Sequence, residues 1–223
     1  MVSISHVVEE IVKHRPYLSE SLSAGIINVS SLARQLKPDV EASMKKEVNT
    51  GAIVMALNRL APYLQVREQV QLNKLLGNMG DIILRSGLCD YTFKNSQSLV
   101  ECHIEVLRNL SKNEGIFYTM VQGVFETNIV ISDVASSLID QHFRNEQCLF
   151  SRSGLSSVTL KLPKGNSMQP GFYYTIMTEL SWEGINLMEV ISSTNEFTVV
   201  VDNEIIDKTF IVLKNMGKGL AQK

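Results

Sequence analysis

The feature that most constrains this chain is an internal repeat, because residues 77–223 pass twice through the same order of strand and helix patterns. The first round has strand patterns near 81–93, 116–121, 125–131 and 148–152, and helix patterns over 96–110 and 133–143. The second round has strand patterns over 157–162, 185–192 and 197–201, and helix patterns over 170–180 and 204–215. Each round therefore predicts the order β-α-β-β-α, which a further strand closes in the first round.

The repeat is also visible in the letters where the first helix of each round gives way to the second strand. LSKNEGI at 110–116 matches LSWEGI at 180–185, an offset of about 70 residues. Here Gly115 and Gly184 can take the left-handed conformation that ends a helix. A repeat of this length and order is typical of the ferredoxin-like β-α-β-β-α-β unit. We therefore expect two such units side by side in one larger sheet, with the helices on one face.

Residues 1–70 carry helical patterns and almost no strand patterns. Apolar spacing, capping residues and prolines predict short helices over 3–15, from Pro16 to Gly25, from Asn28 past Pro38, and from Asn49 or Thr50 to about Pro62. Helices of this number and size are typical of a helix-turn-helix or winged-helix module. The expected fold is α+β, with a helical, helix-turn-helix-like domain over 1–70 and ferredoxin-like units over 77–152 and 153–223.

DNA binding by the helical domain is one hypothesis, with Thr50–Leu60 as the recognition helix. However, residues 1–70 hold eight Lys or Arg against seven Asp or Glu, a difference of +1. Phosphate contacts normally need several unopposed positive charges. The run Ala52–Leu57 is also very apolar, which suits burial or a dimer interface. The pattern therefore favours a packing or oligomerisation module, and DNA binding stays open as the alternative.

The composition is that of an ordinary globular protein with no predicted membrane span. The chain has 21 Lys and Arg against 23 Asp and Glu, a formal net charge of -2, which argues against a strongly basic nucleic-acid binder. It has no apolar run of about 18 residues and no signal peptide at its start. Its cysteines, Cys89, Cys102 and Cys148, lack paired spacing, which fits a reducing compartment. We expect a cytoplasmic protein.

The sequence contains no familiar catalytic or metal-binding motif. The histidines and cysteines lack the spacing of metal ligands, and there is no glycine-rich phosphate loop and no Gly-x-Ser-x-Gly elbow. Ser153–Ser156 is predicted to be a linker loop rather than the site of a nucleophile. We therefore expect no catalytic residue, no metal ion and no cofactor.

Residues 157–216 resemble an ACT domain, and specifically the C-terminal regulatory domain of aspartokinases. The resemblance rests on Met168-Gln-Pro-Gly171 ahead of the first helix, Gly184-Ile-Asn186 after it, Ile191-Ser192 at the end of the second strand, and FTVVV at 197–201. Over 80–152 only the element order and the junction at Gly115 match. The resemblance implies a tandem ACT pair, as aspartokinases carry.

Two departures from the aspartokinase pattern limit what the resemblance implies. Nothing in the sequence resembles the Lys-Phe-Gly-Gly start of the kinase domain. The loop after the first strand of the second unit runs Pro163-Lys-Gly-Asn-Ser167 instead of the Gly-x-Gly that is common in the family. The resemblance therefore implies the sensor without the enzyme.

ACT domains bind small effectors, most often amino acids, where paired units meet. The resemblance places such a site on the loop after the first strand and on the second strand: Gly165, Asn166, Ser167, Met168, Gln169, Gly171, Ile185, Asn186 and Leu187. Backbone N–H groups near Gly171 can hold a carboxylate, and carbonyl and Asn oxygens can accept from an ammonium group. Asn166 and Ser167 are equally well explained as turn and cap residues, and Asn186 as an exposed or strand-capping residue.

Three functions stay open from the sequence. The chain is an amino-acid sensor without catalysis, a ligand-responsive DNA-binding regulator, or a separate regulatory subunit of an aspartokinase-type enzyme. Lysine, threonine, another amino acid, or no effector at all are compatible with the residues. ACT units commonly pair through helices or sheet edges, so the resemblance also implies a homo-oligomer, such as a dimer that brings four ACT units together.

Overall fold

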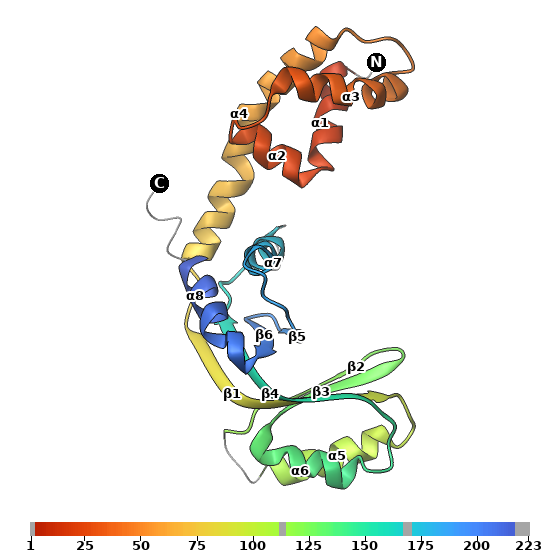
Figure 1. Cartoon of the computed structure of the whole chain (residues 1–223), viewed down its shortest axis with the longest axis vertical. Coiled ribbons are helices and arrows are strands. Elements are labelled where there is room, and N and C mark those ends of the chain that lie inside the picture. Colours follow the sequence, from red (N-terminus) through yellow and green to blue (C-terminus); the bar gives the residue numbers. More distant parts are fainter. Residues whose placement is uncertain (1–2, 112–114, 167–170, 217–223) are drawn as a thin grey trace. The chain divides into compact units, whose positions relative to one another are not determined.

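The computed structural model describes residues 3–111, 115–166 and 171–216, with all side chains in these ranges except those of Pro16, Glu20 and residues 65–75. The chain divides into two compact units, Met1–Lys74 and Leu75–Lys223 (Figure 1). Both predicted rounds of the repeat thus lie in the second unit, which we call the sheet unit. The first is called the helical unit.

The helical unit is formed by α1 (Ile4–Lys13), α2 (Pro16–Ser23), α3 (Val29–Met44) and most of α4 (Thr50–Gly77). Its predicted caps are confirmed. The Asn28 side chain accepts from the Ser31 N–H at 2.9 Å, and the Asn49 side chain accepts from the Gly51 N–H at 2.8 Å. One apolar cluster fills its centre: Val7, Val8, Val12, Leu22, Leu32, Ala33, Leu36, Val40, Val48, Ile53, Ala56 and Leu57.

The structure corrects the predicted end of the last helix, and it also bears on the prediction of a winged-helix module. The prediction that the last helix ends near Pro62 is wrong, because α4 continues to Gly77. A proline inside a helix removes one N–H donor, and the exposed Pro62 is accommodated while the remaining backbone bonds continue the helix. The described part of this unit contains helices and no strand, so it includes no β-hairpin wing.

The sheet unit alternates strands and helices in the predicted order, which confirms the α+β class. Its elements are β1 (Ile82–Lys94), α5 (Leu99–Leu110), β2 (Tyr118–Gln122), β3 (Glu126–Ser132), a 3-10 turn (Asp133–Ala135), α6 (Ser136–His142), β4 (Cys148–Lys161), α7 (Phe172–Trp182), β5 (Glu189–Ser192), β6 (Glu196–Asp202), a 3-10 turn (Asn203–Ile205) and α8 (Ile206–Met216). The strands form one antiparallel sheet in the order β2-β3-β1-β4-β6-β5.

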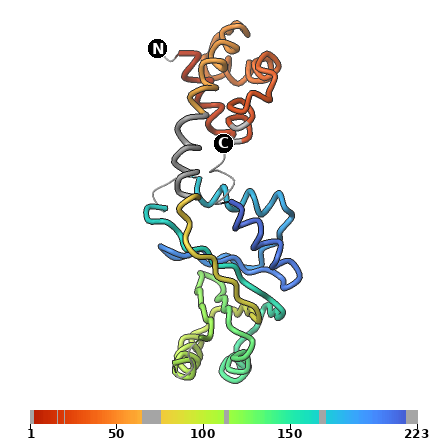
Figure 2. The backbone as a smooth tube through the Cα atoms, turned by 90° about the vertical axis from the view of Figure 1, so that its left-hand side faces the viewer, coloured from red at the N-terminus to blue at the C-terminus, as the bar shows by residue number. Residues whose placement is uncertain are grey.

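The two long strands β1 and β4 each serve both halves of this sheet (Figure 2). The later part of β1, from Leu88, pairs with β3, and the later part of β4, from Leu155, pairs with β6. The early part of each long strand closes the other half, since Ile82 pairs with Leu160 and Phe93 with Cys148. The last strand of each ferredoxin-like half is therefore the early part of the long strand whose later part begins the other half.

Both long strands change register beside a glycine with positive φ, at Gly87 (φ 68°) and Gly154 (φ 73°). The prediction that Ser153–Ser156 is a linker loop is therefore wrong, because these residues lie inside β4. The polar, glycine-containing sequence marks an irregularity in a strand rather than its end. The division of the repeat between residues 152 and 153 stays a prediction, and the backbone there is a continuous strand.

The second strand of each half begins later than the sequence predicts. Residues 185–187 precede β5, which starts at Glu189, and residues 116–117 precede β2. Gly184 has φ 67°, and the Ile185 N–H donates back to the Leu180 carbonyl, so the first residues after the helix complete its cap. The chain consequently enters the sheet only after this turn.

Two of the apolar clusters in the sheet unit lie on opposite sides of β1 and β3. One joins β1 and β3 to α5 and α6 through residues such as Phe93, Leu99, Ile131 and Ile139. The other lies on the opposite side of β1 and β3, since Leu88 and Val130 alternate with residues of the first cluster. It also contains Leu155 of β4 and Val200 of β6, so this helix-free surface joins the two halves.

Alanine substitutions at the two glycines test the bent strands. Left-handed backbone costs a residue with a Cβ about 1–2 kcal/mol, so Gly87→Ala and Gly154→Ala both lower the free energy of unfolding. Gly87→Ala lowers it further, because its Cβ would lie 2.9 Å from Asp133 Oδ2, whereas nothing lies within 4 Å at Gly154. Urea unfolding followed by circular dichroism measures both. Equal losses would contradict the crowding at Gly87.

Candidate functional site

The loop predicted to hold the effector runs from the end of β4 to the start of α7. Gly165 (φ 88°) and Gly171 (φ 85°) both have left-handed backbones, and Gly171 is the N-cap of α7. Three of the predicted loop residues, Ser167, Met168 and Gln169, lie outside the described residues. The described ends of the loop therefore show a turn at Gly165 and a glycine cap at Gly171.

Asn166 is the only predicted loop residue with a buried side chain among those described, at 3% exposure. Its amide nitrogen donates to the carbonyls of Pro163 at 3.0 Å and Thr194 at 2.9 Å. Its oxygen accepts from the Tyr173 hydroxyl at 3.4 Å, and that hydroxyl lies 3.1 Å from Ser192 Oγ. Asn166 thus ties the loop to the turn between β5 and β6 and to α7.

The predicted second-strand residues lie between α7 and β5. Ile185 is buried, Leu187 is half-buried and Asn186 is exposed. Within the described part of the chain, the Asn186 side chain makes no hydrogen bond. None of the hydrogen bonds of Asn166 reaches these three residues. The two groups therefore differ in structure, since Asn166 is buried and holds the loop whereas Asn186 is exposed.

A polar contact that the sequence did not reveal joins the two halves on the helix-free surface. The Asn128 amide on β3 donates to Asp90 Oδ1 on β1 at 2.6 Å and to Glu189 Oε1 on β5 at 2.9 Å. Asp90 is 1% exposed. Burial raises the pKa of both carboxyl groups, and the neighbouring Asp90 charge raises the pKa of Glu189 further. The Asn128 amide thus lies between two carboxyl groups, and burial disfavours the charged form of each.

A groove of about 430 Å³ lies between α5 and the edge strand β2. Its lining residues are Val100, His103, Leu107, Tyr118, Met120 and Gln122. His103 Nδ1 lies 2.7 Å from the Tyr118 hydroxyl. Burial lowers the pKa of His103 and raises the pKa of Tyr118 to about 12, so both are neutral at pH 7. The groove therefore offers an uncharged, largely apolar surface.

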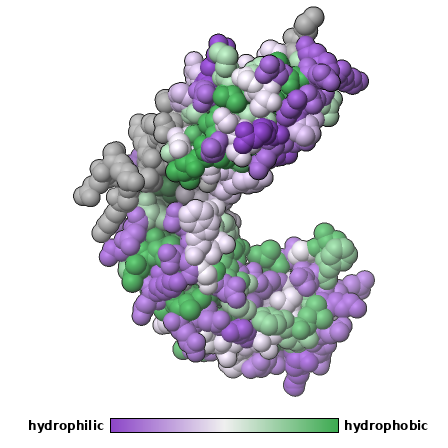
Figure 3. Space-filling model, turned by 45° about the horizontal axis from the view of Figure 1, so that its top comes forward, coloured by the Kyte–Doolittle hydropathy of each residue, from purple (hydrophilic) through white to green (hydrophobic). Residues whose placement is uncertain are grey.

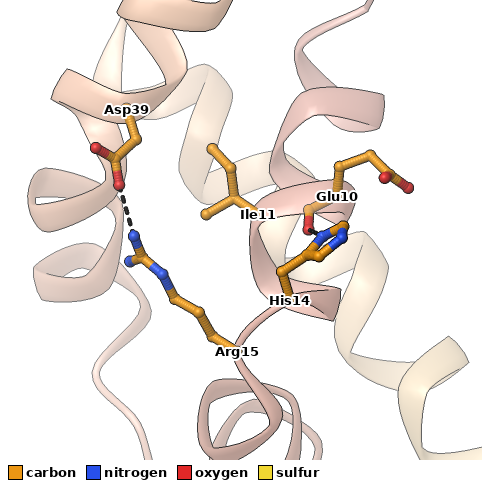
Figure 4. A pocket seen from close by; sticks show the side chains of 5 residues that line it. All are labelled: Glu10, Ile11, His14, Arg15 and Asp39. Carbon is orange, nitrogen blue, oxygen red and sulfur yellow. Dashed lines mark hydrogen bonds and ion pairs between the residues drawn. The ribbon is translucent and has the colours of Figure 1, made fainter.

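A second, shallow pocket of about 380 Å³ lies on the helical unit (Figure 4). It is lined by Glu10, Ile11, His14, Arg15 and Asp39. Arg15 forms an ion pair with Asp39 at 2.8 Å, and the His14 ring lies 2.7 Å from the Glu10 carbonyl. Arg15 and Asp39 already pair with each other, so neither is free for a charged ligand.

In the described ranges, no group of three or more His, Cys, Asp or Glu is arranged to hold a metal ion. No helix of the described chain combines the length and the hydropathy needed to cross a bilayer.

Comparison with known proteins finds matches only among solved structures, since no family model and no curated protein matches the chain. The aspartate kinase of Clostridium acetobutylicum, described as an allosteric enzyme, is 18% identical with a TM-score of 0.52. The match covers 63% of this chain and 35% of that one, so this chain spans about a third of the kinase.

Two further matches superpose less well. The regulatory subunit of aspartate kinase from Thermus thermophilus is 12% identical with a TM-score of 0.48, over 62% of this chain and 97% of that one. Escherichia coli aspartokinase III, solved with lysine and aspartate, is 13% identical with a TM-score of 0.45, over 64% and 33%. These neighbours are aspartokinases and a regulatory subunit of one. At such identities the first match shows the fold alone, and the fold agrees with the resemblance seen in the sequence.

The paired carboxyls predict a pH dependence of stability. Because burial raises the pKa of Asp90 above the unfolded value of about 4, the folded state holds a proton that the unfolded state releases. The stability that this proton provides is complete below about pH 4 and is lost as the pH rises through the folded pKa. Asp90→Asn removes that loss and keeps an acceptor for Asn128.

The measurement compares urea unfolding of Asp90→Asn and wild type from pH 4 to pH 7. The variant gains stability relative to wild type as the pH rises, by about 1.4 kcal/mol for each unit of raised pKa. Asp140→Asn is the control, since it removes another carboxyl group, one that is exposed on α6. A flat difference for Asp90→Asn would show that this carboxyl is not coupled to folding.

Proposed function

We propose that this chain is a non-catalytic, cytoplasmic regulatory protein that senses a small effector, an amino acid, through the two ACT-like halves of the sheet unit. The observation that carries the proposal is the fold, because the sheet unit pairs two ferredoxin-like halves on shared strands and matches part of an allosteric aspartate kinase. The residues that resemble ACT domains add the effector class. Because the match to the kinase is only 18% identical and shows the fold alone, the amino-acid effector is proposed from the sequence resemblance.

The proposed effector site combines the two groups of residues described above. The loop at Gly165 and the backbone at Gly171 bind the carboxylate, because N–H groups at the start of α7 point outward there. Asn166 holds the loop in shape through its bonds to Pro163 and Thr194, so its amide is already occupied. Asn186 is exposed and makes no side-chain hydrogen bond among the described residues, so in this proposal its amide oxygen accepts from the ammonium group. Ser167, Met168 and Gln169 complete the loop in this proposal.

A thermal-shift screen of the full chain against the twenty amino acids tests the proposal. An amino acid that binds only the folded state, at a free concentration of a hundred times its Kd, stabilises that state by about 2.7 kcal/mol. For a chain of this size, the midpoint then rises by roughly 5–10 °C. Asn186→Ala reduces the rise, because the variant lacks the proposed acceptor for the ammonium group.

The control for this screen is Asn145→Ala, which removes another exposed amide far from the loop in sequence. It keeps the full rise. If none of the twenty amino acids raises the midpoint of the wild type, the sensing proposal is wrong. If Asn186→Ala keeps the rise, sensing stands and the assigned site is wrong.

For the helical unit we propose a packing or oligomerisation role rather than DNA binding. The candidate recognition helix contributes Ile53, Ala56 and Leu57 to the apolar cluster of this unit, and the near balance of charges in residues 1–70 supports the same view. A gel shift that responds to an amino acid would instead favour the DNA-binding regulator. Co-purification with a separate kinase chain would favour the regulatory subunit of an aspartokinase-type enzyme.

A further inference from the structure

The hydrogen bond from Asn128 to Glu189 joins two strands that are not neighbours in the sheet. Between β3 and β5 lie β1, β4 and β6. Adjacent strands are about 4.8 Å apart, so four such spacings in a flat sheet exceed the reach of an Asn and a Glu side chain. The bond, at 2.9 Å, therefore requires a sheet that bends over its helix-free surface. It links the two halves across this bend.

The Asn128 amide brings two carboxyl groups close together. Its nitrogen carries two N–H groups, and it donates to Asp90 at 2.6 Å and to Glu189 at 2.9 Å. A third distance, 3.5 Å to Thr92 Oγ1, is too long to compete. We call Asp90 and Glu189 the carboxyl pair. Because both accept from one nitrogen, two negative charges on this pair would repel each other at short range.

Asp90 is enclosed, and the arginines of β1 and β4 have other partners. Charged groups normally stay at the surface, and the visible face of the sheet unit in Figure 3 carries much hydrophilic colour. Asp90 is instead 1% exposed. Arg152 of β4 lies opposite it in the sheet register and pairs with Asp202 at 2.6 Å. Arg85 of β1 lies over the Phe117 ring, 5.6 Å from its centre. An Asp90 anion would therefore depend chiefly on Asn128.

Glu189 has a like charge beside it and a route to water. It is half-buried at the start of β5, which is an edge strand, and the apolar Val200 lies opposite on β6. Glu126 of β3 adds a negative charge that disfavours the Glu189 anion. Lys94 of β1 lies opposite Glu126 in the register. Of the carboxyl pair, Glu189 is thus the member that can turn outward.

We propose that the carboxyl pair and Asn128 form a proton-dependent latch between the two halves of the sheet unit. While the pair holds one proton, one carboxyl group is neutral and both accept from the Asn128 amide. When that proton passes to water as the pH rises, the two anions repel each other. Glu189 then turns into the solvent, its bond to Asn128 breaks, and the bend loses this link. Burial raises the pKa of both carboxyl groups, which fits a proton retained above the ordinary range.

The latch reaches the parts of the proposed effector site through β5. Glu189 is the first residue of this strand, and residues 185–187 lie shortly before it. Ser192 at the end of the strand lies 3.1 Å from the Tyr173 hydroxyl, which also contacts Asn166. Opening of the latch therefore frees the strand that connects these groups. The inference goes beyond effector binding, because none of the latch residues belongs to the proposed site.

Nuclear magnetic resonance of the full chain tests the latch from pH 4 to pH 8, with no effector added. The carboxyl carbon signals of Asp90 and Glu189 follow the same two steps, because interacting groups titrate as a pair. The upper step lies above the ordinary value of about 4.3 for a glutamic acid. At this step one Asn128 amide proton signal moves to the position of a solvent-exposed amide, while the proton bonded to Asp90 keeps its bond.

Two substitutions at Glu189 separate the proton from the hydrogen bond. Glu189→Gln keeps an acceptor for Asn128 and takes up no proton, so both amide proton signals stay in place up to pH 8. Glu189→Ala removes the acceptor, so one amide proton is at the solvent-exposed position at every pH. In both variants Asp90 titrates in a single step, at least about one pH unit below the upper step of the wild type.

The control is Glu196→Gln, which removes an exposed carboxyl group on the neighbouring β6 and leaves both steps and both amide signals unchanged. Circular dichroism checks that each variant is folded. Three results would overturn the proposal: carboxyl groups that titrate independently at ordinary values, Asn128 signals that stay in place while the pair titrates, or a Glu189→Gln variant whose amide signal still moves with pH. The thermal-shift screen reports effector binding separately.

Discussion

The antiparallel pairing of β1 with β4 is the contact on which the sheet unit depends. Each of these strands opens one ferredoxin-like half and closes the other, so neither half has a complete sheet without its neighbour. The register shifts beside Gly87 and Gly154 let one backbone serve two differently oriented halves. A ligand that alters either half can therefore act on the other through shared backbone rather than through a loosely packed interface.

The helix-free surface adds a second link between the halves, in which the apolar residues correspond but the polar residues differ. Leu88 and Val130 of one half pack with Leu155 and Val200 of the other, which is a nearly symmetric apolar arrangement. The polar residues beside it differ. In the sheet register Asp90 and Asn128 correspond to Ser157 and Thr198, so one half carries a buried carboxyl where the other carries a hydroxyl. Burying a carboxylate costs more free energy than burying a hydroxyl, because its charge has to leave water.

The sequence was sufficient for features that depend on local patterns, and it failed where partners are distant. The element order, the caps at Asn28 and Asn49 and the helix-ending Gly184 follow from local preferences, and all are present. The shared strands could not be predicted, because the residues around Gly154 are typical of a turn. They form a strand only because this segment pairs with the distant β1. The same holds for Asp90, Asn128 and Glu189, which approach one another only in the folded sheet.

The repeat gives the two halves different chemistry at corresponding positions. In the second half, Asn166 and Tyr173 connect the loop, the helix and β5 by hydrogen bonds, which shapes a polar site beside a polar hairpin tip. In the first half, the corresponding position on the helix is His103, bonded to Tyr118 within an apolar groove, and the hairpin tip is Val124 and Phe125. The polar loop of the second half suits the proposed capture of a zwitterion, whereas the first half has an uncharged, largely apolar groove. Both halves share β1 and β4, so a change of shape in one half reaches the other through backbone that is common to both.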